Sequence, residues 1–208
     1  MSVGTIINLK AVYRPRGTIL GKFLSALVVG TVLGLLLTFV VLENGLGFGA
    51  IVAGPWTGWP RSGTPDVDPY TRAMLAYSGE VPLSVSEGLS FIARRDSEGS
   101  DLYSECDYTL QGRMPRARFW TLTLLSPSGL PVASKADRHG FTSSEILRGS
   151  DGAFQVALSR HARAGNWLPI GDTSKFILVL HLYDSELNGA MTALDAADMP
   201  QIVRGRCE

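Results

Sequence analysis

An uncharged apolar run near the N-terminus constrains this chain more than any other feature. From Phe23 to Leu42, twenty residues include no charged residue, Asn, Gln or Pro. As a helix rising about 1.5 Å per residue, the run is about 30 Å long, which matches the hydrocarbon thickness of a bilayer. A buried core helix of this length would carry a polar stripe, and this run carries none. The sequence therefore predicts one transmembrane helix over residues 23–42.

The charges before this run predict its orientation. The first 22 residues contain four Lys or Arg and no acidic residue, so we expect residues 1–22 to form a cytoplasmic arm and the chain after Glu43 to be exported. A cleaved signal peptide is the alternative. Its apolar region would be shorter, about 7–15 residues, and the nearest small-residue site, Ile51–Ala53, lies well past the run. We favour the uncleaved anchor.

Gly30 and Gly34 form a G-x-x-x-G motif, through which two copies of the helix can associate into a homo-oligomer.

The net charge separates into two compartments. The whole chain is neutral, with 19 Lys or Arg and 19 Asp or Glu. Residues 44–208 carry 15 basic and 18 acidic residues, so the exported part is mildly acidic. This balance excludes a strongly basic nucleic-acid binder, and we expect no nucleic-acid partner. The hydrophobic content of 45% excludes a disordered chain.

Residues 43–65 are rich in Gly and Pro and predict a linker. Two tryptophans in this segment, Trp56 and Trp59, belong to the candidate binding surface. They can lie at the membrane headgroups or pack on the exported domain, and we favour packing. Asp68-Pro69 then predicts the start of a short helix that ends before Gly79, because Asp is a good N-cap and Pro suits the first helical position.

Residues 66–208 predict a mainly β domain. The spacing of apolar residues changes to two, and short segments alternate with turns rich in Gly, Pro, Asp and Ser, a pattern typical of an antiparallel β-sandwich, jelly-roll-like in form. The expected strands are Leu89–Arg95, Leu102–Leu110, Arg118–Leu125, Pro131–Ser134, Gly152–Ser159 and Lys175–Tyr183. The last is apolar on both faces, which predicts a central strand covered on each side. The tail Thr192–Met199 favours one or two helical turns.

Two cysteines, Cys106 and Cys207, both lie in the exported part, where an even pair favours a disulfide. Two buried thiols or one reactive cysteine are the alternatives.

Asn166 and Trp167 form the other candidate binding surface, because a loop Trp beside an Asn can stack on a sugar or bind a partner. The alternative, which we favour, is a Trp that closes the end of the sandwich.

The sequence offers no catalytic, cofactor-binding or metal-binding motif. The three histidines lack matched ligand spacing, and His181 suits a hydrogen-bonded core position. One hairpin is rich in carboxylates, which glycosidases use in pairs, but solvated turn residues explain such a cluster more simply, and we favour that interpretation. These residues are Asp96, Glu98, Asp101, Glu105 and Asp107.

Several blocks together resemble one protein family. They are GPWTGWPRSGTPDVDPYTRA, LSFIARRDSEG, CDYTLQGRMPRARFWTLTL, ILRGSDGAF, GNWLP and FILVLHLYD. In this order they resemble the uncharacterised bacterial envelope family called domain of unknown function twelve-fourteen, from about Gly54 to the C-terminus. The resemblance implies a β-sandwich and supplies no reaction, so it assigns no catalytic residue.

The combined features predict a single-pass protein of the bacterial inner membrane with a periplasmic β-sandwich. We expect this domain to act as a binding or assembly module in the cell envelope, with another envelope protein or a glycan as its partner and with no cofactor. The alternative is a carboxylate-dependent enzyme acting on envelope or extracellular polysaccharide. The sequence favours the binding module over the enzyme.

Overall fold

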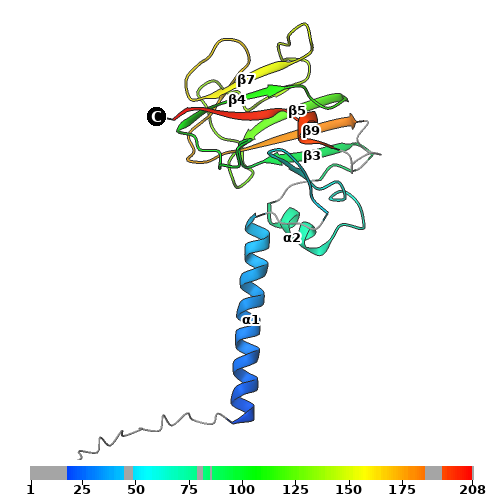
Figure 1. The fold of residues 1–208 in the computed structure, drawn as a ribbon, viewed down its shortest axis with the longest axis vertical. Helices are drawn as coiled ribbons and strands as arrows, with labels where there is room; N and C mark the ends of the chain where they lie inside the picture. The colour runs from blue at the N-terminus through cyan, green and yellow to red at the C-terminus, as the bar shows by residue number, and fades with distance from the viewer. Residues whose placement is uncertain (1–17, 45–48, 79–81, 85, 186–193, 208) are drawn as a thin grey trace, which may run out of the picture. The chain divides into compact units, whose positions relative to one another are not determined.

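The computed structural model describes residues 18–44, 49–78, 82–84, 86–185 and 194–207 (Figure 1). The chain separates into two units, divided after Val41. The first contains most of helix α1 (Ile19–Asn44). Its segment Ile19–Val41 is long and apolar enough to cross a membrane, and none of it is buried. A membrane anchor and a signal sequence share these properties, and both have an apolar surface on every side of the helix.

The second unit is a sandwich of two β-sheets, as the sequence predicts. The strands of the six-stranded sheet lie in the order β1 (Ile51–Ala53), β2 (Trp56–Gly58), β3 (Gly88–Ala93), β9 (Ile177–Ser185), β5 (Ala117–Leu125) and β6 (Gly140–Thr142). Those of the four-stranded sheet lie in the order β10 (Gln201–Cys207), β4 (Cys106–Gly112), β7 (Phe154–Ser159) and β8 (Trp167–Pro169). Neighbouring strands are antiparallel except for β7 and β8, which are parallel.

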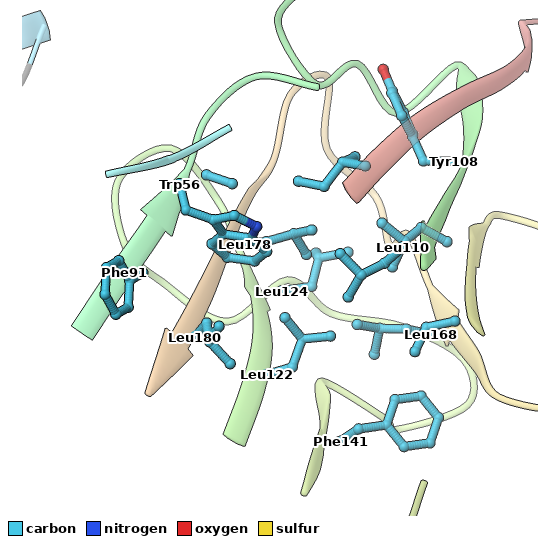
Figure 2. Packing of buried hydrophobic residues seen from close by; sticks show 14 of the residues in the cluster. Trp56, Phe91, Tyr108, Leu110, Leu122, Leu124, Phe141, Leu168, Leu178 and Leu180 are labelled. Atoms are coloured by element: carbon cyan, nitrogen blue, oxygen red, sulfur yellow. The ribbon is translucent and has the colours of Figure 1, made fainter. Parts of the chain in front are cut away.

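The main core fills the space between the two sheets (Figure 2). Alternate residues of each strand point inward, because successive side chains of a strand lie on opposite faces. On β9, Leu178, Leu180 and Leu182 are fully buried. Tyr108 and Leu110 of β4 belong to the same core. The inner faces of both sheets are therefore closed to solvent, which leaves the outer faces as the surfaces open to a partner.

Strand β9 is the covered central strand that its sequence predicts. It pairs with β3 on one side and with β5 on the other. Its outward residues Ile177 and Val179 form a second apolar cluster with Trp59 and Ile92, against which Met74 packs. Met74 belongs to helix α2 (Pro69–Ser78), so this helix covers part of the outer face of the six-stranded sheet.

Helix α2 begins as the sequence predicts. The Asp68 carboxylate oxygen Oδ1 accepts hydrogen bonds from the backbone N–H groups of Tyr70 and Thr71, each at 3.0 Å. These bonds satisfy two of the donors that a helix N-terminus leaves without a partner. The helix begins at Pro69, the residue type whose fixed φ suits the first turn.

The structure corrects two expectations. The expected linker, residues 43–65, contains the hairpin β1–β2, which extends the six-stranded sheet by pairing with β3. Pro131–Ser134 forms one isolated bridge, Leu125 to Pro131, because Pro donates no ladder hydrogen bond. The expected helical turn of the tail is present as the 3₁₀ turn η3 (Ala196–Asp198), while residues 192 and 193 lie outside the described part. Strands β6, β8 and β10 are absent from the sequence prediction.

Candidate binding site

The tryptophans of the expected linker are part of the sandwich. Trp56 is fully buried, and its Nε1 donates a hydrogen bond of 2.7 Å to the Pro200 carbonyl. Trp59 is 9% exposed and belongs to the outer apolar cluster. Both side chains therefore pack on the domain, the favoured alternative, and neither presents its ring at the surface.

Asn166 fastens two segments of chain together. Its Nδ2 donates to the carbonyls of Leu147 and Gln155, and its Oδ1 accepts from the Leu147 N–H, each at 2.8 Å. The residue is 8% exposed. All of these bonds are internal, so the amide of Asn166 holds the loop before β7 against β7 itself.

Trp167 lies beside this amide at the edge of the four-stranded sheet. Its Nε1 donates to the Ser159 carbonyl at 3.0 Å, and the residue is half-buried. Trp167 pairs with Ala157 of β7. Paired residues on neighbouring strands share a face, so the Trp167 ring lies on the outer face of this sheet. Part of the ring remains open to solvent there.

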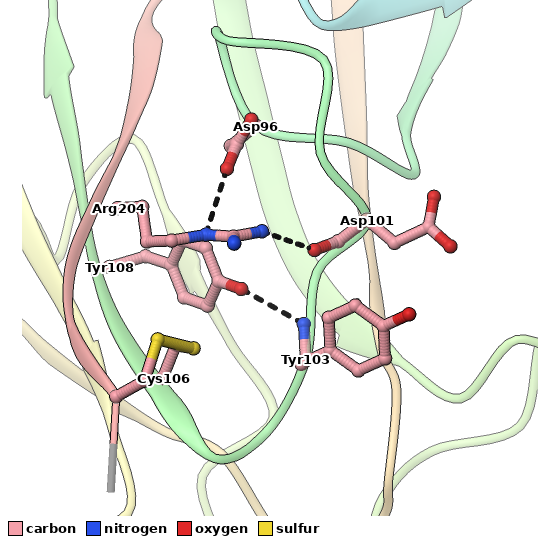
Figure 3. The surroundings of a disulfide bond; sticks show 7 residues. Asp96, Asp101, Tyr103, Cys106, Tyr108 and Arg204 are labelled. Atoms are coloured by element: carbon pink, nitrogen blue, oxygen red, sulfur yellow. Dashed lines mark hydrogen bonds and ion pairs between the residues drawn. A yellow bond between two sulfur atoms is a disulfide. The ribbon is translucent and has the colours of Figure 1, made fainter.

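The predicted disulfide is present and joins Cys106 of β4 to Cys207 of β10 (Figure 3). It fastens the C-terminal strand to the strand beside it. Because disulfides persist in oxidising compartments, the bond indicates that the sandwich folds in one.

Beside the disulfide, Arg204 of β10 is held by a buried carboxylate (Figure 3). Its Nε lies 3.0 Å from Asp96 Oδ2, and Asp96 is 2% exposed. Arg204 Nη2 also donates to the Asp101 carbonyl at 2.8 Å. The guanidinium lies 5.7 Å from the centre of the Tyr108 ring. Covalent and ionic contacts therefore fix β10 in place along the four-stranded sheet.

Strands β3 and β4 belong to different sheets, so the expected carboxylate-rich hairpin is instead a connection between the sheets. Two carboxylates of this region, Asp101 and Asp107, make structural contacts. Lys175 Nζ donates to Asp101 Oδ2 at 2.8 Å, and this bond lowers the pKa of Asp101. Burial raises the pKa of Asp107. Hydrogen bonds from Ser159 and Arg163 together lower this pKa by more than burial raises it, so the pKa lies below its ordinary value. A glycosidase general acid requires a raised pKa. Both carboxylates are shifted in the opposite direction.

The histidines form no ligand set with other residues. His181 is half-buried on the outer face of β9, where burial lowers its pKa. Its Nδ1 lies 3.5 Å from the Tyr183 hydroxyl oxygen. Within the described ranges, no three His, Cys, Asp or Glu side chains come together as metal ligands.

A broad groove of about 750 Å³ crosses the outer face of the four-stranded sheet. The groove is shallow and open, unlike an enclosed ligand cavity. Strands β4, β7 and β10 form its floor, and the loops around Leu147 and Gly165 contribute to its walls. Asn166 joins Leu147 to Gln155 of β7, so its amide sets the position of one wall relative to the floor.

The floor of the groove contains a ladder of three glutamines. Gln201 of β10 pairs with Gln111 of β4, and Gln111 pairs with Gln155 of β7. Gln155 Nε2 lies 3.5 Å from Gln111 Oε1. The chain has three glutamines in all, and the fold brings every one of them to this face. We call Gln111, Gln155 and Gln201 the glutamine ladder.

The sequence pattern contains half of the signal for this ladder. Gln111 follows the inward Leu110, and Gln155 lies between the inward Phe154 and Val156, so the alternation alone places both side chains outward. The register that puts them side by side joins residues 44 positions apart. No local pattern specifies such a pairing, and the ladder is therefore absent from the sequence prediction.

One family model matches part of the chain. The family model described as protein of unknown function (DUF1214) matches residues 87–187. No curated protein matches the chain. The structure of the VPA0106 protein from Vibrio parahaemolyticus is similar, with a TM-score of 0.53 and 21% identity over 68% of this chain. This chain covers 36% of that protein.

A structure of an uncharacterized protein from Burkholderia cenocepacia has a TM-score of 0.38 and 18% identity, covering 71% of this chain and 48% of that one. The match to residues 87–187 extends from β3 through β9 and includes Gln111 and Gln155. The model described as protein of unknown function (DUF1214) thus matches the part of the chain that contains most strands of the sandwich, in agreement with the resemblance of the sequence blocks.

Proposed function

We propose that this chain is a single-pass protein of the bacterial inner membrane whose periplasmic sandwich binds an envelope partner in the groove of the four-stranded sheet. The groove with its glutamine ladder is the observation that carries this proposal. Three strands hold the ladder, and the disulfide and the Arg204–Asp96 ion pair fix the outermost of them, β10. A site on rigid strands binds with little loss of conformational freedom.

The location rests on two features of the chain. Helix α1 is apolar over a bilayer's thickness, and the basic residues before it favour a cytoplasmic N-terminus. The disulfide supports an oxidising compartment for the sandwich. A reporter enzyme that folds only in the periplasm, fused after Glu208, should therefore be active, whereas the same fusion after Arg16 should be inactive.

The arrangement of carboxylates favours binding over hydrolysis. Asp101 and Asp107 are engaged by Lys175 and Arg163, at 2.8 Å and 2.6 Å, and the pKa of each is lowered. Each is therefore already bound to a cation, and neither is prepared to donate a proton. The glutamine ladder supplies hydrogen bonds and no group that titrates, which suits recognition.

Helix α1 offers a second surface for association. At Gly30 and Gly34, nothing lies within 4 Å of the position that a Cβ would occupy. We propose that two helices meet at this motif, since small residues let helix backbones approach closely. Gly34→Leu should then reduce crosslinking between copies in membranes, while Leu35→Ala, one residue away, should leave it unchanged.

Site-specific photo-crosslinking in native membranes tests the groove. A p-benzoylphenylalanine residue in place of Gln155, which is exposed on the groove floor, should give a crosslinked product of raised mass. The same residue in place of Leu130, which is 64% exposed in the turn after β5, serves as the matched control. The proposal fails if positions 155 and 130 give the same products or none.

A further inference from the structure

The chemistry of the groove identifies the class of its ligand, on the basis of the proposed function above. We infer that the groove binds an uncharged glycan chain, held by hydrogen bonds from the glutamine ladder. Strands in a sheet are about 4.8 Å apart, so three paired glutamines extend about 10 Å across the floor. The ladder therefore presents a row of amides to an extended ligand.

The amides match sugar hydroxyls. A glutamine amide donates two hydrogen bonds and accepts at its carbonyl oxygen. A sugar hydroxyl likewise both donates and accepts, so each amide can bind neighbouring hydroxyls without charge on either side. Gln155 and Gln201 are exposed, and Gln111 between them is half-buried, which leaves polar atoms of the ladder open to a ligand.

The charges of the groove argue against an anionic ligand. Among the lining residues, only Arg113 and Asp151 are charged, and Arg113 Nη2 lies 3.7 Å from Asp151 Oδ2. The two charges cancel. Nearby, the Arg163 guanidinium is bound by Asp107 at 2.6 Å. An acidic glycan or a phosphate would thus meet no unpaired cation along the lining.

The apolar part of the groove argues against a protein ligand. Protein interfaces depend on large side chains such as Trp, Tyr and Arg that insert into pockets. In the lining, the aromatic side chain is Phe154, which is 3% exposed. The small residues Ala153, Ala157 and Ala164 leave the floor low and open.

Binding of defined oligosaccharides tests this inference. The full chain is placed in phospholipid nanodiscs, because maltoside detergents carry a neutral sugar head group that would compete. The probes are cellohexaose, maltohexaose and mannohexaose as neutral glycans, and hexagalacturonate as an acidic glycan. At least one neutral probe should bind, and hexagalacturonate should bind at least tenfold more weakly.

Paired variants assign the binding to the ladder. Gln155→Ala with Gln201→Ala changes two exposed side chains and should weaken neutral-glycan binding about tenfold or more, since each amide contributes hydrogen bonds. Ser90→Ala with Thr123→Ala removes two half-buried hydroxyls from the six-stranded sheet and should leave binding unchanged. Equal melting temperatures of both double variants and the original chain confirm intact folds.

The remaining outcomes separate this inference from the proposed function. If the ladder variant weakens only hexagalacturonate binding, or if no probe binds while position 155 crosslinks to one discrete protein, the glycan class is wrong and the groove remains a binding site. If the ladder variant binds every probe as well as the original chain does, or if neither probe binding nor crosslinking is found, both the inference and the proposed function are overturned.

Discussion

Removing the disulfide should lower the stability of the sandwich by several kcal/mol. Cys106→Ala with Cys207→Ala opens a crosslink between residues 101 positions apart. In the chain-entropy model, a loop of about 100 residues stabilises the folded state by about 4.7 kcal/mol, because the crosslink restricts the unfolded chain. Native contacts still hold β10 in place, since Ile202 is fully buried and Arg204 binds Asp96.

Urea unfolding followed by tryptophan fluorescence measures this loss, because Trp56 and Trp120 lie in the core. With a slope of about 2 kcal/mol per molar urea, the midpoint should fall by about 2 M. The original chain in reductant should show the same fall. A free-thiol titration of the unfolded, unreduced chain should find no thiol. Unchanged midpoints in both the variant and the reduced chain would refute the reasoning.

Three further changes test the contacts around the site. Arg204→Met should cost about 3–5 kcal/mol in urea unfolding, because it leaves the Asp96 carboxylate buried without its cation; a cost below about 1 kcal/mol would contradict a buried ion pair. Asn166→Ala should cost about 2–3 kcal/mol, since three backbone hydrogen bonds lose their partner, and an unchanged melting temperature would argue against this role. Asp101 has a pKa lowered mainly by Lys175, so its contribution to stability is complete above the unfolded value of about 3.9 and is lost as the pH falls through the lower folded value. Asp101→Asn should therefore flatten the loss of stability between pH 5 and pH 2, and a parallel profile would exclude the contribution of this carboxylate.

The sequence predicts the parts of the fold that local patterns determine. The apolar run predicts α1, Asp68-Pro69 predicts the start of α2, and the two-sided apolar pattern of Lys175–Tyr183 predicts β9 at the centre of a sheet. In each case, neighbouring residues supply the physical cause: hydrophobic length, an N-cap, or apolar side chains on both faces of a strand.

Other elements form because distant partners select them. The Gly- and Pro-rich segment of Trp56 becomes β2 through pairing with β3 and through the hydrogen bond from Trp56 to Pro200, 144 residues away. Strand β10 contains two arginines and a glycine, a weak strand pattern, yet β4, the disulfide and Asp96 hold it. Tertiary contacts override the local preference in both.

The candidate site divides in the same way. Asn166 and Trp167 attract attention in the sequence as an Asn beside a Trp in a loop, but the Asn166 amide is used within the fold and positions a wall of the groove. The three glutamines stand out only when the register of β10, β4 and β7 is known. A row of side chains that strand pairing assembles is therefore not visible in the sequence.

Selective labelling of the glutamine side chains tests the central claim most directly. Because the chain has three glutamines and all three form the ladder, ¹⁵N-amide glutamine labelling gives three pairs of side-chain NH₂ signals that all report on the groove. The account predicts that titrating the full chain in nanodiscs with the bound neutral oligosaccharide shifts all three pairs along one saturation curve. Saturable binding that leaves the three pairs unchanged would place the ligand elsewhere and contradict the account.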